Sequence, residues 1–577
     1  MTDWGGDNDH AAGVKAGSNL VMPAPGADCA MGLLKALEEG RIMEADIDAR
    51  VEEFLAVALE LYGRVAKQPK TFDVDAHHAV ARKCAEGSIV LLENDGILPL
   101  DRSKTVALIG DFAQTPRYQG AGSSQVNPTK LVDLKDALGS SGLEITGFAT
   151  GYSRTDPKPD RSLIDPAVAL AKMADVVLLC VGLDEIAESE GLDRTHLNLS
   201  AGQLALIEEV RRTNANVVLV LCGGAPFLMP GSDKFRAAIH GYLGGQAGAQ
   251  AMADAILGKI NPSGKLSETW PLALEHDPAN PYYPSSQRTS EYREGLYVGY
   301  RYYDTAGVPV RYPFGYGISY TKFTYSELEA DRENVSFTLA NTGTMDGAEI
   351  AQVYISAKNS RVYRPRKELK GFAKVSLKAG ESRRVTISLD DKAFRYFNTV
   401  TNRWETEPGE YEIFVAANVL DVRLSQTIRV DGAEVPVPEL LPSYRDCAVN
   451  NVSDEVYAKL LGRPIPDGTW GGVLEKNDAI CQMYYAKSGL ARLACKLLTA
   501  LKDKAEAKGK PDLNILFIYN MPSRAMGKMA GSIISEKMVD DILLIVNGHF
   551  FRGMGRLIAD FFRNQRDSKK FLKKLEG

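Results

Sequence analysis

The sequence predicts a multidomain chain that combines an α/β fold with an all-β fold and ends in a helical tail. Three observations support this prediction. Short apolar runs alternate with helical patterns in the first half, apolar and polar residues alternate with a period of two from about residue 321, and helical patterns dominate after about residue 440. The length of 577 residues leaves room for about three to five domains.

Composition excludes several classes of protein. The 45% hydrophobic and 25% charged residues are typical of a globular protein, not of a disordered chain or a disulfide scaffold. The 68 basic and 74 acidic residues give a net charge of −6, so we expect no nucleic-acid partner. Seven cysteines without a C-x-x-C pair, and an N-terminus without an apolar leader, favour a cytoplasmic protein with reduced thiols. No apolar run is long enough to span a bilayer.

Residues 1–70 are predicted to be the end of a domain rather than a whole one. They begin with a Gly- and Asp-rich loop and continue with helical patterns at Ala30–Leu37 and Ile47–Tyr62. The run Asp7-Asn8-Asp9-His10 could suggest a metal site, but no Glu follows at position twelve as in an EF-hand loop. We therefore interpret it as a solvated helix start.

Residues 77–270 are predicted to form an α/β sandwich with a largely parallel sheet. Continuous Val, Leu and Ile runs bounded by glycine are typical of strands covered on both faces. Helical patterns at Ser200–Arg212 and Ala247–Leu257 separate some of them. The expected strands are Ile89–Leu92, Val106–Gly110, Val176–Gly182, Val217–Cys222 and Ala237–Tyr242.

Three further regions complete the chain. A connector rich in Pro and Tyr covers 271–320, and an antiparallel sandwich covers 321–430. The sandwich has no Cys…Trp…Cys pattern, so a fibronectin type III-like form is preferred over an immunoglobulin form. Residues 440–577 are predicted to be helical, with long helices at Ala479–Lys508 and Glu536–Phe562 and a basic end.

The chemistry of the chain is expected to lie in a loop of carboxylates. G-x-S-x-G, P-loop and H-E-x-x-H motifs are absent, and Gly120–Ser124 lacks the G-x-G-x-x-G of a dinucleotide loop. That glycine-rich segment is instead expected to line a cleft. Five carboxylates lie between Asp184 and Arg194, directly after a buried strand, where open α/β sheets place their ligands. On pattern alone, a solvated loop is the more common explanation for them.

Several motifs resemble those of glycoside hydrolase family 3, the β-glucosidase family. Ser189-Glu190-Gly191-Leu192-Asp193-Arg194 is similar to the family's E-G-Y-D-R loop, and Thr2-Asp3-Trp4-Gly5-Gly6 is similar to its S/T-D-W segment. The chain is identified as a member of this family because the matches keep one order over residues 1–430. The other matching segments are AGSNLVMP at 16–23, SIVLLEN at 88–94, GQAG at 245–248, NPSGKL at 261–266, GYRYYD at 299–304 and YPFGYGISYT at 312–321.

The resemblance implies a retaining exo-β-glycosidase that acts on a small β-glycoside or oligosaccharide without metal or cofactor. It assigns Asp3 as the nucleophile and Glu190 as the acid/base, with Glu188 as a second choice for the acid. Trp4 is expected to stack on the sugar, although a place in a domain core is the alternative. The implied architecture is a (β/α)₈-type barrel, an α/β sandwich and a fibronectin-like domain.

The sequence departs from the family pattern at its beginning. The family's barrel precedes the nucleophile by some two hundred residues, so residues 1–70 are expected to be a remnant that keeps the last barrel strand and helices. We therefore expect the 577-residue chain by itself to be inactive or nearly so. The alternative is a non-catalytic scaffold that binds carbohydrate or a partner chain.

The helical tail allows a weaker hypothesis. Gly548-His549-Phe550-Phe551 and the basic helix after Arg552 could form a surface for homo-oligomers or for a membrane. We expect the helix to pack on the protein itself and expect no membrane partner. His549 is expected to be structural, because no second ligand lies at metal spacing.

Overall fold

The computed structural model of the chain describes residues 1–23, 26–68, 70–231, 235–285, 287–530 and 533–576. It divides into two compact units. The first contains Met1–Asp73, Gly468–Ala507 and Pro511–Gly577, and the second contains Val74–Asp467 and Lys508–Lys510. None of the helices within these six described ranges is long and apolar enough to cross a lipid bilayer.

The first unit is helical and is built from both ends of the chain. Helix α2 contacts α16, and α15 and α16 pack against each other. Its N-terminal helices are α1 (His10–Lys15), α2 (Ala27–Glu38) and α3 (Glu44–Val65), and its C-terminal helices are α12 (Gly489–Glu506), α13 (Leu513–Asn520), α14 (Ala525–Met529), α15 (Glu536–Val546) and α16 (Phe550–Glu576).

Two predicted helices in this unit are wrong in their limits. The expected helix Ala479–Lys508 is a 3-10 turn over Ile480–Tyr485 followed by α12, because Ser488 caps the helix through the amide of Ala491. The expected helix Glu536–Phe562 is two helices that meet at Asn547, Gly548 and His549. Gly548 has a φ of +94°, a conformation that glycine adopts readily and that ends α15.

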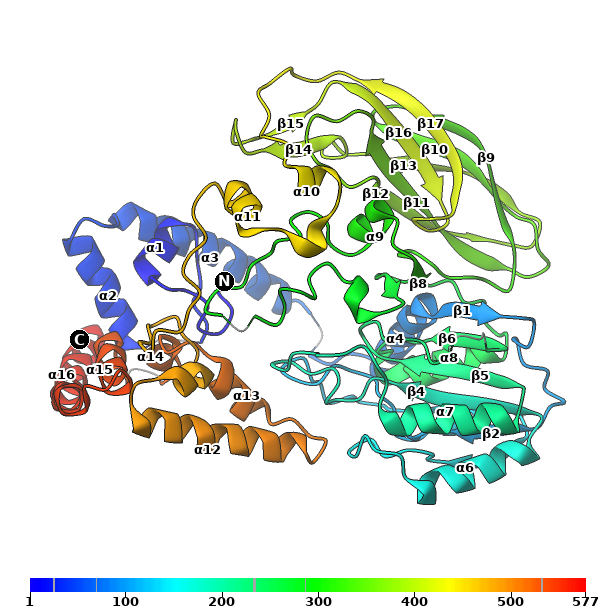
Figure 1. Cartoon of the computed structure of the whole chain (residues 1–577), viewed down its shortest axis with the longest axis horizontal. Coiled ribbons are helices and arrows are strands. Elements are labelled where there is room, and N and C mark those ends of the chain that lie inside the picture. Colours follow the sequence, from blue (N-terminus) through cyan, green and yellow to red (C-terminus); the bar gives the residue numbers. More distant parts are fainter. Residues whose placement is uncertain (24–25, 69, 232–234, 286, 531–532, 577) are drawn as a thin grey trace. The chain divides into compact units, whose positions relative to one another are not determined.

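The second unit begins with a six-stranded sheet in the order β1-β6-β5-β4-β2-β3. Only β1 is antiparallel to its neighbour, so the prediction of a largely parallel sheet is confirmed. Figure 1 shows α6 (Arg161–Met173) and α7 (Ala201–Thr213) on one face and α4 (Val74–Ser88) and α8 (Gly248–Ile256) on the other. The strands are β1 (Val90–Asn94), β2 (Val106–Ile109), β3 (Ile145–Ala149), β4 (Val176–Gly182), β5 (Val217–Cys222) and β6 (Ala237–His240).

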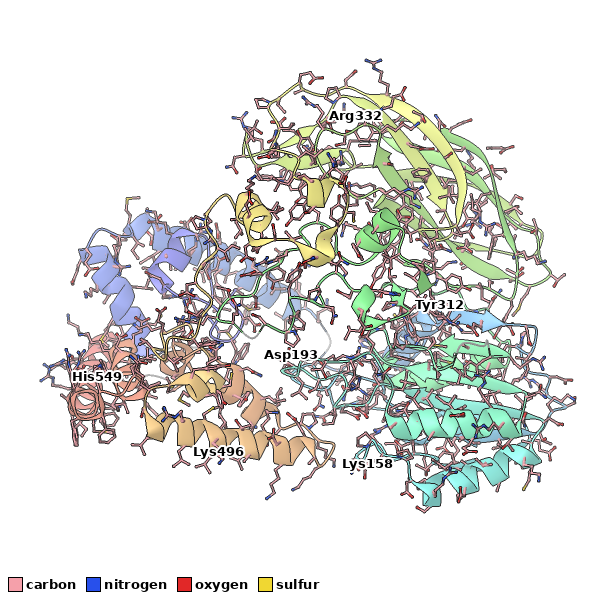
Figure 2. All side chains as sticks on the ribbon, viewed as in Figure 1. Lys158, Asp193, Tyr312, Arg332, Lys496 and His549 are labelled. Atoms are coloured by element: carbon pink, nitrogen blue, oxygen red, sulfur yellow. The ribbon has the colours of Figure 1, made fainter. Side chains whose placement is uncertain are left out.

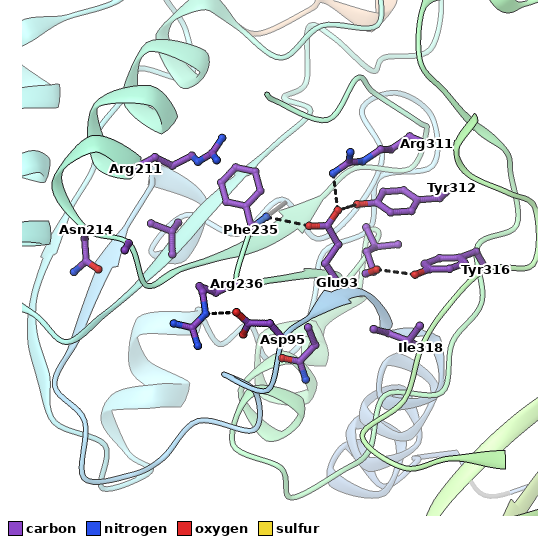
Figure 3. A pocket seen from close by; sticks show the side chains of 14 residues that line it. Glu93, Asp95, Arg211, Asn214, Phe235, Arg236, Arg311, Tyr312, Tyr316 and Ile318 are labelled. Atoms are coloured by element: carbon purple, nitrogen blue, oxygen red, sulfur yellow. Dashed lines mark hydrogen bonds and ion pairs between the residues drawn. The ribbon is translucent and has the colours of Figure 1, made fainter. Parts of the chain in front are cut away.

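The segment after residue 270 packs on this α/β core. Strands β7 (Trp270–Pro271) and β8 (Val310–Tyr312) pair, and Trp270 and Tyr312 lie in the core cluster. Glu93 of β1 fixes the segment, because its carboxylate accepts hydrogen bonds of 2.6 Å from the Arg311 guanidinium and from the Tyr312 hydroxyl (Figure 3). These contacts line a cavity of about 720 Å³ near the amino end of β5.

Residues 323–430 form the fibronectin-like sandwich that the two-residue period predicts. Val335, Phe337 and Leu339 are buried, and their neighbours are less so. The two sheets have the orders β13-β10-β9 and β12-β11-β16-β17, with a hairpin β14-β15 beside them. The strands are β9 (Phe323–Ala330), β10 (Asn334–Asn341), β11 (Gly347–Ala357), β12 (Glu368–Leu377), β13 (Ser382–Ser388), β14 (Arg395–Asn398), β15 (Arg403–Thr406), β16 (Gly409–Ala416) and β17 (Val422–Val430).

The predicted helical range 440–577 is divided in the structure. Helices α10 (Pro442–Arg445) and α11 (Asp454–Leu461) lie in the second unit, where they pack beside α9 (Tyr300–Ala306). The Tyr297 hydroxyl donates to the Tyr444 carbonyl oxygen over 2.7 Å. From Gly468 to Ala507 the chain belongs to the first unit.

Candidate active site

The carboxyl ends of β2 and β4 meet at a point where the sheet changes its winding direction. The chain leaves β2 toward β3 on one side, whereas β4, β5 and β6 follow one another on the other side. Open α/β sheets bind ligands at such a switch point. Asp111 follows β2, and the carboxylate loop that begins at Asp184 follows β4.

Glu190 is held against the glycine-rich loop at this edge. Its amide donates to the Ala121 carbonyl oxygen over 2.9 Å, and its Oε2 accepts from both the amide and the hydroxyl of Ser123 at 2.6 Å. Gly122 has a φ of +134°, and a Cβ there would lie 2.5 Å from the Glu190 side chain. The carboxylate itself remains on an exposed residue. The glycine-rich loop therefore fixes a carboxylate that solvent can reach.

Glu188, the second choice for the acid, is turned inward. Its Oε2 accepts from the amide of Gly224 over 2.9 Å and lies 3.6 Å from Nη2 of Arg117. Its side chain is 19% exposed. These contacts tie the loop to the end of β5 and leave Glu188 less exposed than Glu190.

A buried ion network supports the same loop from below. The Arg117 side chain is 1% exposed, and its Nη2 donates to the Glu188 carbonyl oxygen over 2.9 Å. Arg154 Nε lies 3.0 Å from Asp111 Oδ2, and Nη1 lies 3.4 Å from Glu185. Burial raises the pKa of Asp111, and the charge of Arg154 opposes that rise. The network joins the end of β2 to the loop after β4.

The far end of the loop is also fixed. The Tyr283 hydroxyl donates to Asp193 Oδ1 over 2.5 Å, which raises the pKa of Tyr283 to about 12. Arg194 donates to the Pro226 carbonyl oxygen over 2.9 Å. Burial and the nearby charge of Glu188 raise the pKa of Glu268. Figure 2 shows Asp193 in the loop beyond the carboxyl end of the sheet.

Asp3 and Trp4 lie in the first unit. The Trp4 amide donates to Asp3 Oδ1 over 2.7 Å, and the Thr2 amide donates to the Leu20 carbonyl oxygen over 2.9 Å. Trp4 is 52% exposed, so its alternative interpretation as a core residue is wrong. Glu190 lies in the second unit, so neither unit contains both predicted carboxylates.

The loop that carries Asp3 is held by α14 and by Arg524, the residue just before it. Arg524 donates to the carbonyl oxygens of Gly5 and Asp7 over 2.7 and 2.9 Å, and Lys528 pairs with the Asp7 carboxylate. Asp9 caps α1 by accepting from the amide of Ala12, so a helix does start at this acidic run. Within the described part of residues 1–73 the structure has helices only, so the expected barrel strand is missing there.

His549 lies in the turn between α15 and α16 and is exposed (Figure 2). Its amide donates to the Leu544 carbonyl oxygen over 2.8 Å. In the ranges that the structure describes, His, Cys, Asp and Glu side chains form no group of three that could hold a metal ion.

Sequence reasoning missed the residues that support Glu190. Gly122, Ser123 and Arg117 come from the loop after β2, at least 67 positions from Glu190 in the chain. The sequence predicts that Gly120–Ser124 lines a cleft, but no local pattern in the sequence predicts that this segment contacts the carboxylate loop. The position of both segments after the carboxyl ends of strands is the one feature of the sequence that indicates this contact.

Comparisons with known proteins agree with this architecture. A family model described as the glycosyl hydrolase family 3 C-terminal domain matches residues 89–320, and one described as a fibronectin type III-like domain matches residues 349–419. The thermostable beta-glucosidase B of Acetivibrio thermocellus is 41% identical over 443 residues. The exo-alpha-(1->6)-L-arabinopyranosidase of Bifidobacterium breve is 41% identical over 448 residues. Each match covers 75% of this chain but only 58% and 59% of these two relatives.

Solved structures give the same result. The crystal structure of a GH3 beta-glucosidase from Bifidobacterium adolescentis superimposes with a TM-score of 0.72 at 39% identity, covering 80% of this chain and 68% of that one. The beta-glucosidase 3B of Thermotoga neapolitana, solved with alpha-D-glucose, gives a TM-score of 0.67 at 29% identity and covers 74% of this chain and 66% of that one. With its α/β sheet, its fibronectin-like sandwich and these relatives, the chain belongs to glycoside hydrolase family 3.

Proposed function

We propose that the chain is the part of a retaining exo-β-glycosidase that supplies the acid/base Glu190 and the nucleophile Asp3, and that it acts on terminal, non-reducing β-linked sugars. The observation that carries the proposal is the setting of Glu190. It is an exposed carboxylate at the carboxyl edge of a parallel sheet, and a glycine and a serine from another loop hold it in place.

The proposed chemistry needs only these two carboxyl groups. A carboxylate oxygen of Asp3 bonds to the anomeric carbon while the glycosidic C–O bond breaks, and Glu190 gives its proton to the leaving oxygen. Glu190, now ionised, then takes a proton from water, whose oxygen attacks the anomeric carbon and releases Asp3. Two inversions retain the β configuration. The mechanism requires the two carboxyl groups to act about 5–5.5 Å apart.

The exposed ring of Trp4, next to Asp3 in the chain, fits the proposal that it stacks on a sugar. The interpretation of residues 1–70 as the end of a barrel stays a prediction that rests on the motifs at Asp3 and at 16–23. The low activity expected of the 577-residue chain also stays a prediction.

Azide rescue tests the two roles separately. With 2,4-dinitrophenyl β-D-glucopyranoside, the leaving group needs no proton, so Glu190→Ala should form the glycosyl-enzyme and then stall. Added azide should restore turnover and yield a β-glucosyl azide. Asp3→Gly should instead yield an α-glucosyl azide, because azide replaces the nucleophile itself. The same azide ion is added to both variants. The anomer of the glucosyl azide therefore shows whether the variant lacks the acid/base or the nucleophile.

Glu188→Ala is the matched control within the loop. It should lose stability but should show no azide rescue, because its carboxylate is tied to Gly224 and Arg117. If Glu188→Ala formed a β-glucosyl azide and Glu190→Ala did not, Glu188 and not Glu190 would be the acid/base. Glu190→Gln separates the glycosidase from the scaffold, because it should leave sugar binding roughly intact and remove any hydrolysis.

A further inference from the structure

A second cavity, which shares no lining residue with the Glu190 loop, lies on the fibronectin-like domain. It has a volume of about 580 Å³, within the ~300–1,000 Å³ of small-molecule sites. Its walls are the hairpin β14-β15, the chain from Val362 to Lys370, which ends in the first residues of β12, and the segment that carries α10 and α11. We name it the hairpin groove.

Two of the four aromatic rings that line the hairpin groove are exposed. Phe397 and Trp404 are directly opposite each other on the two strands, so their side chains share one face of the hairpin. Their ring centres lie 5.5 Å apart in an edge-to-face arrangement. Phe397 is 45% exposed and Trp404 is 62% exposed. Rings that are this accessible offer the flat apolar surface that packs against the C–H face of a sugar.

The polar lining of the hairpin groove is mainly positive. Arg395 shares the face of Phe397, because the two are separated by one residue of β14. The basic side chains that line the groove are Arg364, Lys370, Lys392, Arg395 and Lys459, and the acidic ones are Glu368 and Glu439.

Four of these five cations have a carboxylate partner within the protein. Arg395 pairs with Asp391, and Lys459 lies 3.6 Å from Glu455. Arg364 and Lys370 share one carboxylate, that of Glu368. The Arg364 side chain is 8% exposed; its Nη2 donates to Glu368 over 3.2 Å, whereas its buried Nη1 finds no hydrogen-bond acceptor of normal geometry among the described residues. Glu368 is also the partner of Lys370, at 3.5 Å. Burial lowers the pKa of Lys370; Glu368 opposes that shift and Arg364 adds to it. One carboxylate therefore serves two cations.

We propose that the hairpin groove binds an acidic oligosaccharide, with sugar rings on Trp404 and Phe397 and a uronate carboxylate at the wall of Arg364 and Lys370. The exposed rings account for the sugar, and the two cations that share the single carboxylate of Glu368 account for the acid. The site is separate from the proposed catalysis and does not depend on it, because no carboxylate assigned to hydrolysis lines the groove.

The test uses isothermal titration calorimetry on the whole 577-residue chain. The probe is tetragalacturonate, and its fully methyl-esterified form is the matched neutral ligand. We expect the acidic probe to bind at least tenfold more tightly than the ester in low salt, and 0.3 M NaCl to remove most of that difference. Trp404→Ala and Lys370→Gln should each weaken binding of the acidic probe by about tenfold.

Phe372→Ala is the control for loss of an exposed aromatic ring on the same domain. Phe372 is 66% exposed but lies outside the groove, so this variant should bind like the unmodified chain. Equal binding of acid and ester, equal losses in Phe372→Ala and Trp404→Ala, or no heat with either ligand would overturn the proposal. So would a dimer in light scattering that Trp404→Ala converts to monomers, because a second copy would then cover the rings. Glu190→Gln should keep full binding, which separates this result from any result on hydrolysis.

Discussion

At the scale of single residues, the position of the Glu190 carboxylate depends on the lack of a side chain at Gly122. Gly122 has no side chain, and this leaves room for the Glu190 carboxylate to reach the amide and hydroxyl of Ser123. The contact lets two donors orient the carboxylate while it stays open to solvent. A proton donor needs this combination of fixed position and access.

Gly122→Ala is therefore expected to impair catalysis more than binding. The new Cβ would lie 2.5 Å from Glu190, and a φ of +134° is strained for alanine. Whatever low rate the unmodified chain shows with phenyl β-D-glucoside should fall at least tenfold, whereas its rate with the dinitrophenyl glucoside should fall much less, because that leaving group needs no acid. Steady-state kinetics with the two substrates measure the difference.

Gly120→Ala is the control for this prediction. Gly120 has an ordinary φ, and its Cβ would meet only the Ser124 hydroxyl at 3.0 Å. It should reduce both activities to the same small extent. If Gly122→Ala lowered the two rates equally, the glycine would affect the loop as a whole and not the proton transfer.

Arg117 is expected to contribute stability by pairing the buried end of the carboxylate loop. Arg117→Met leaves Glu188 and Glu185 without this cation and the Glu188 carbonyl oxygen without its donor. The free energy of unfolding should fall by about 3 kcal/mol. Urea denaturation checks the value, and exposed Arg102→Met, with an expected change below about 0.5 kcal/mol, is the control. A loss of the same small size for Arg117→Met would contradict the network's role.

At the scale of elements, β6 carries a group that makes stability depend on pH. His240 is 1% exposed and packs against Tyr242 and Trp270, and burial lowers its pKa from 6.5 to about 3. The unfolded chain therefore binds a proton between pH 6.5 and 3 that the folded chain does not. His240 favours the folded state fully above pH 6.5, and that contribution is lost as the pH falls toward 3.

His240→Phe should remove this dependence. Between pH 7.5 and pH 5.0 the unmodified chain should lose about 2 kcal/mol of unfolding free energy more than the variant. Urea denaturation at the two pH values measures the difference. Phenylalanine keeps an aromatic ring against Trp270, so an equal loss in both proteins would mean that other groups cause the dependence.

The elements also show which parts of the fold the sequence can predict. Strands β4 and β5 are predicted with their observed limits, because continuous apolar runs are buried on both faces. Strand β3 is missed, since Ile145–Ala149 is only half-buried at the sheet edge and contains Thr146 and Gly147. The helix limits near Ser488 and Gly548 are missed because a cap and a turn interrupt an otherwise continuous helical pattern.

At the scale of the whole molecule, the first unit joins the two ends of the chain. Residues 1–70 are predicted as a domain end, but their partners, α14 to α16, lie more than 450 positions away. No periodicity or motif in either segment indicates the other. The proposed catalytic residues are predictable only from motifs, whereas Gly122, Ser123 and Arg117 need the folded structure.

Lys528→Met tests the joining of the two ends. Lys528 pairs with Asp7, and each side chain is 10% exposed, so the variant leaves a buried carboxylate without its cation. Hydrogen exchange should accelerate in residues 1–15 and stay unchanged in residues 90–430. Exposed Lys537→Met is the control and should change neither region. Unchanged exchange in residues 1–15 of Lys528→Met would mean that α14 does not hold the N-terminal loop.

The pairing of the Glu190 loop with the glycine-rich loop has a consequence for engineering within the family. A designer who grafts residues 184–194 onto another scaffold would move the Glu190 carboxylate without the loop that orients it. The donor amide of Ser123, the space at Gly122 and the guanidinium of Arg117 belong to residues 117–124, so the transplantable unit is the pair of loops. Recombination that separates the two loops would leave Glu190 without the two donors of Ser123 that orient it.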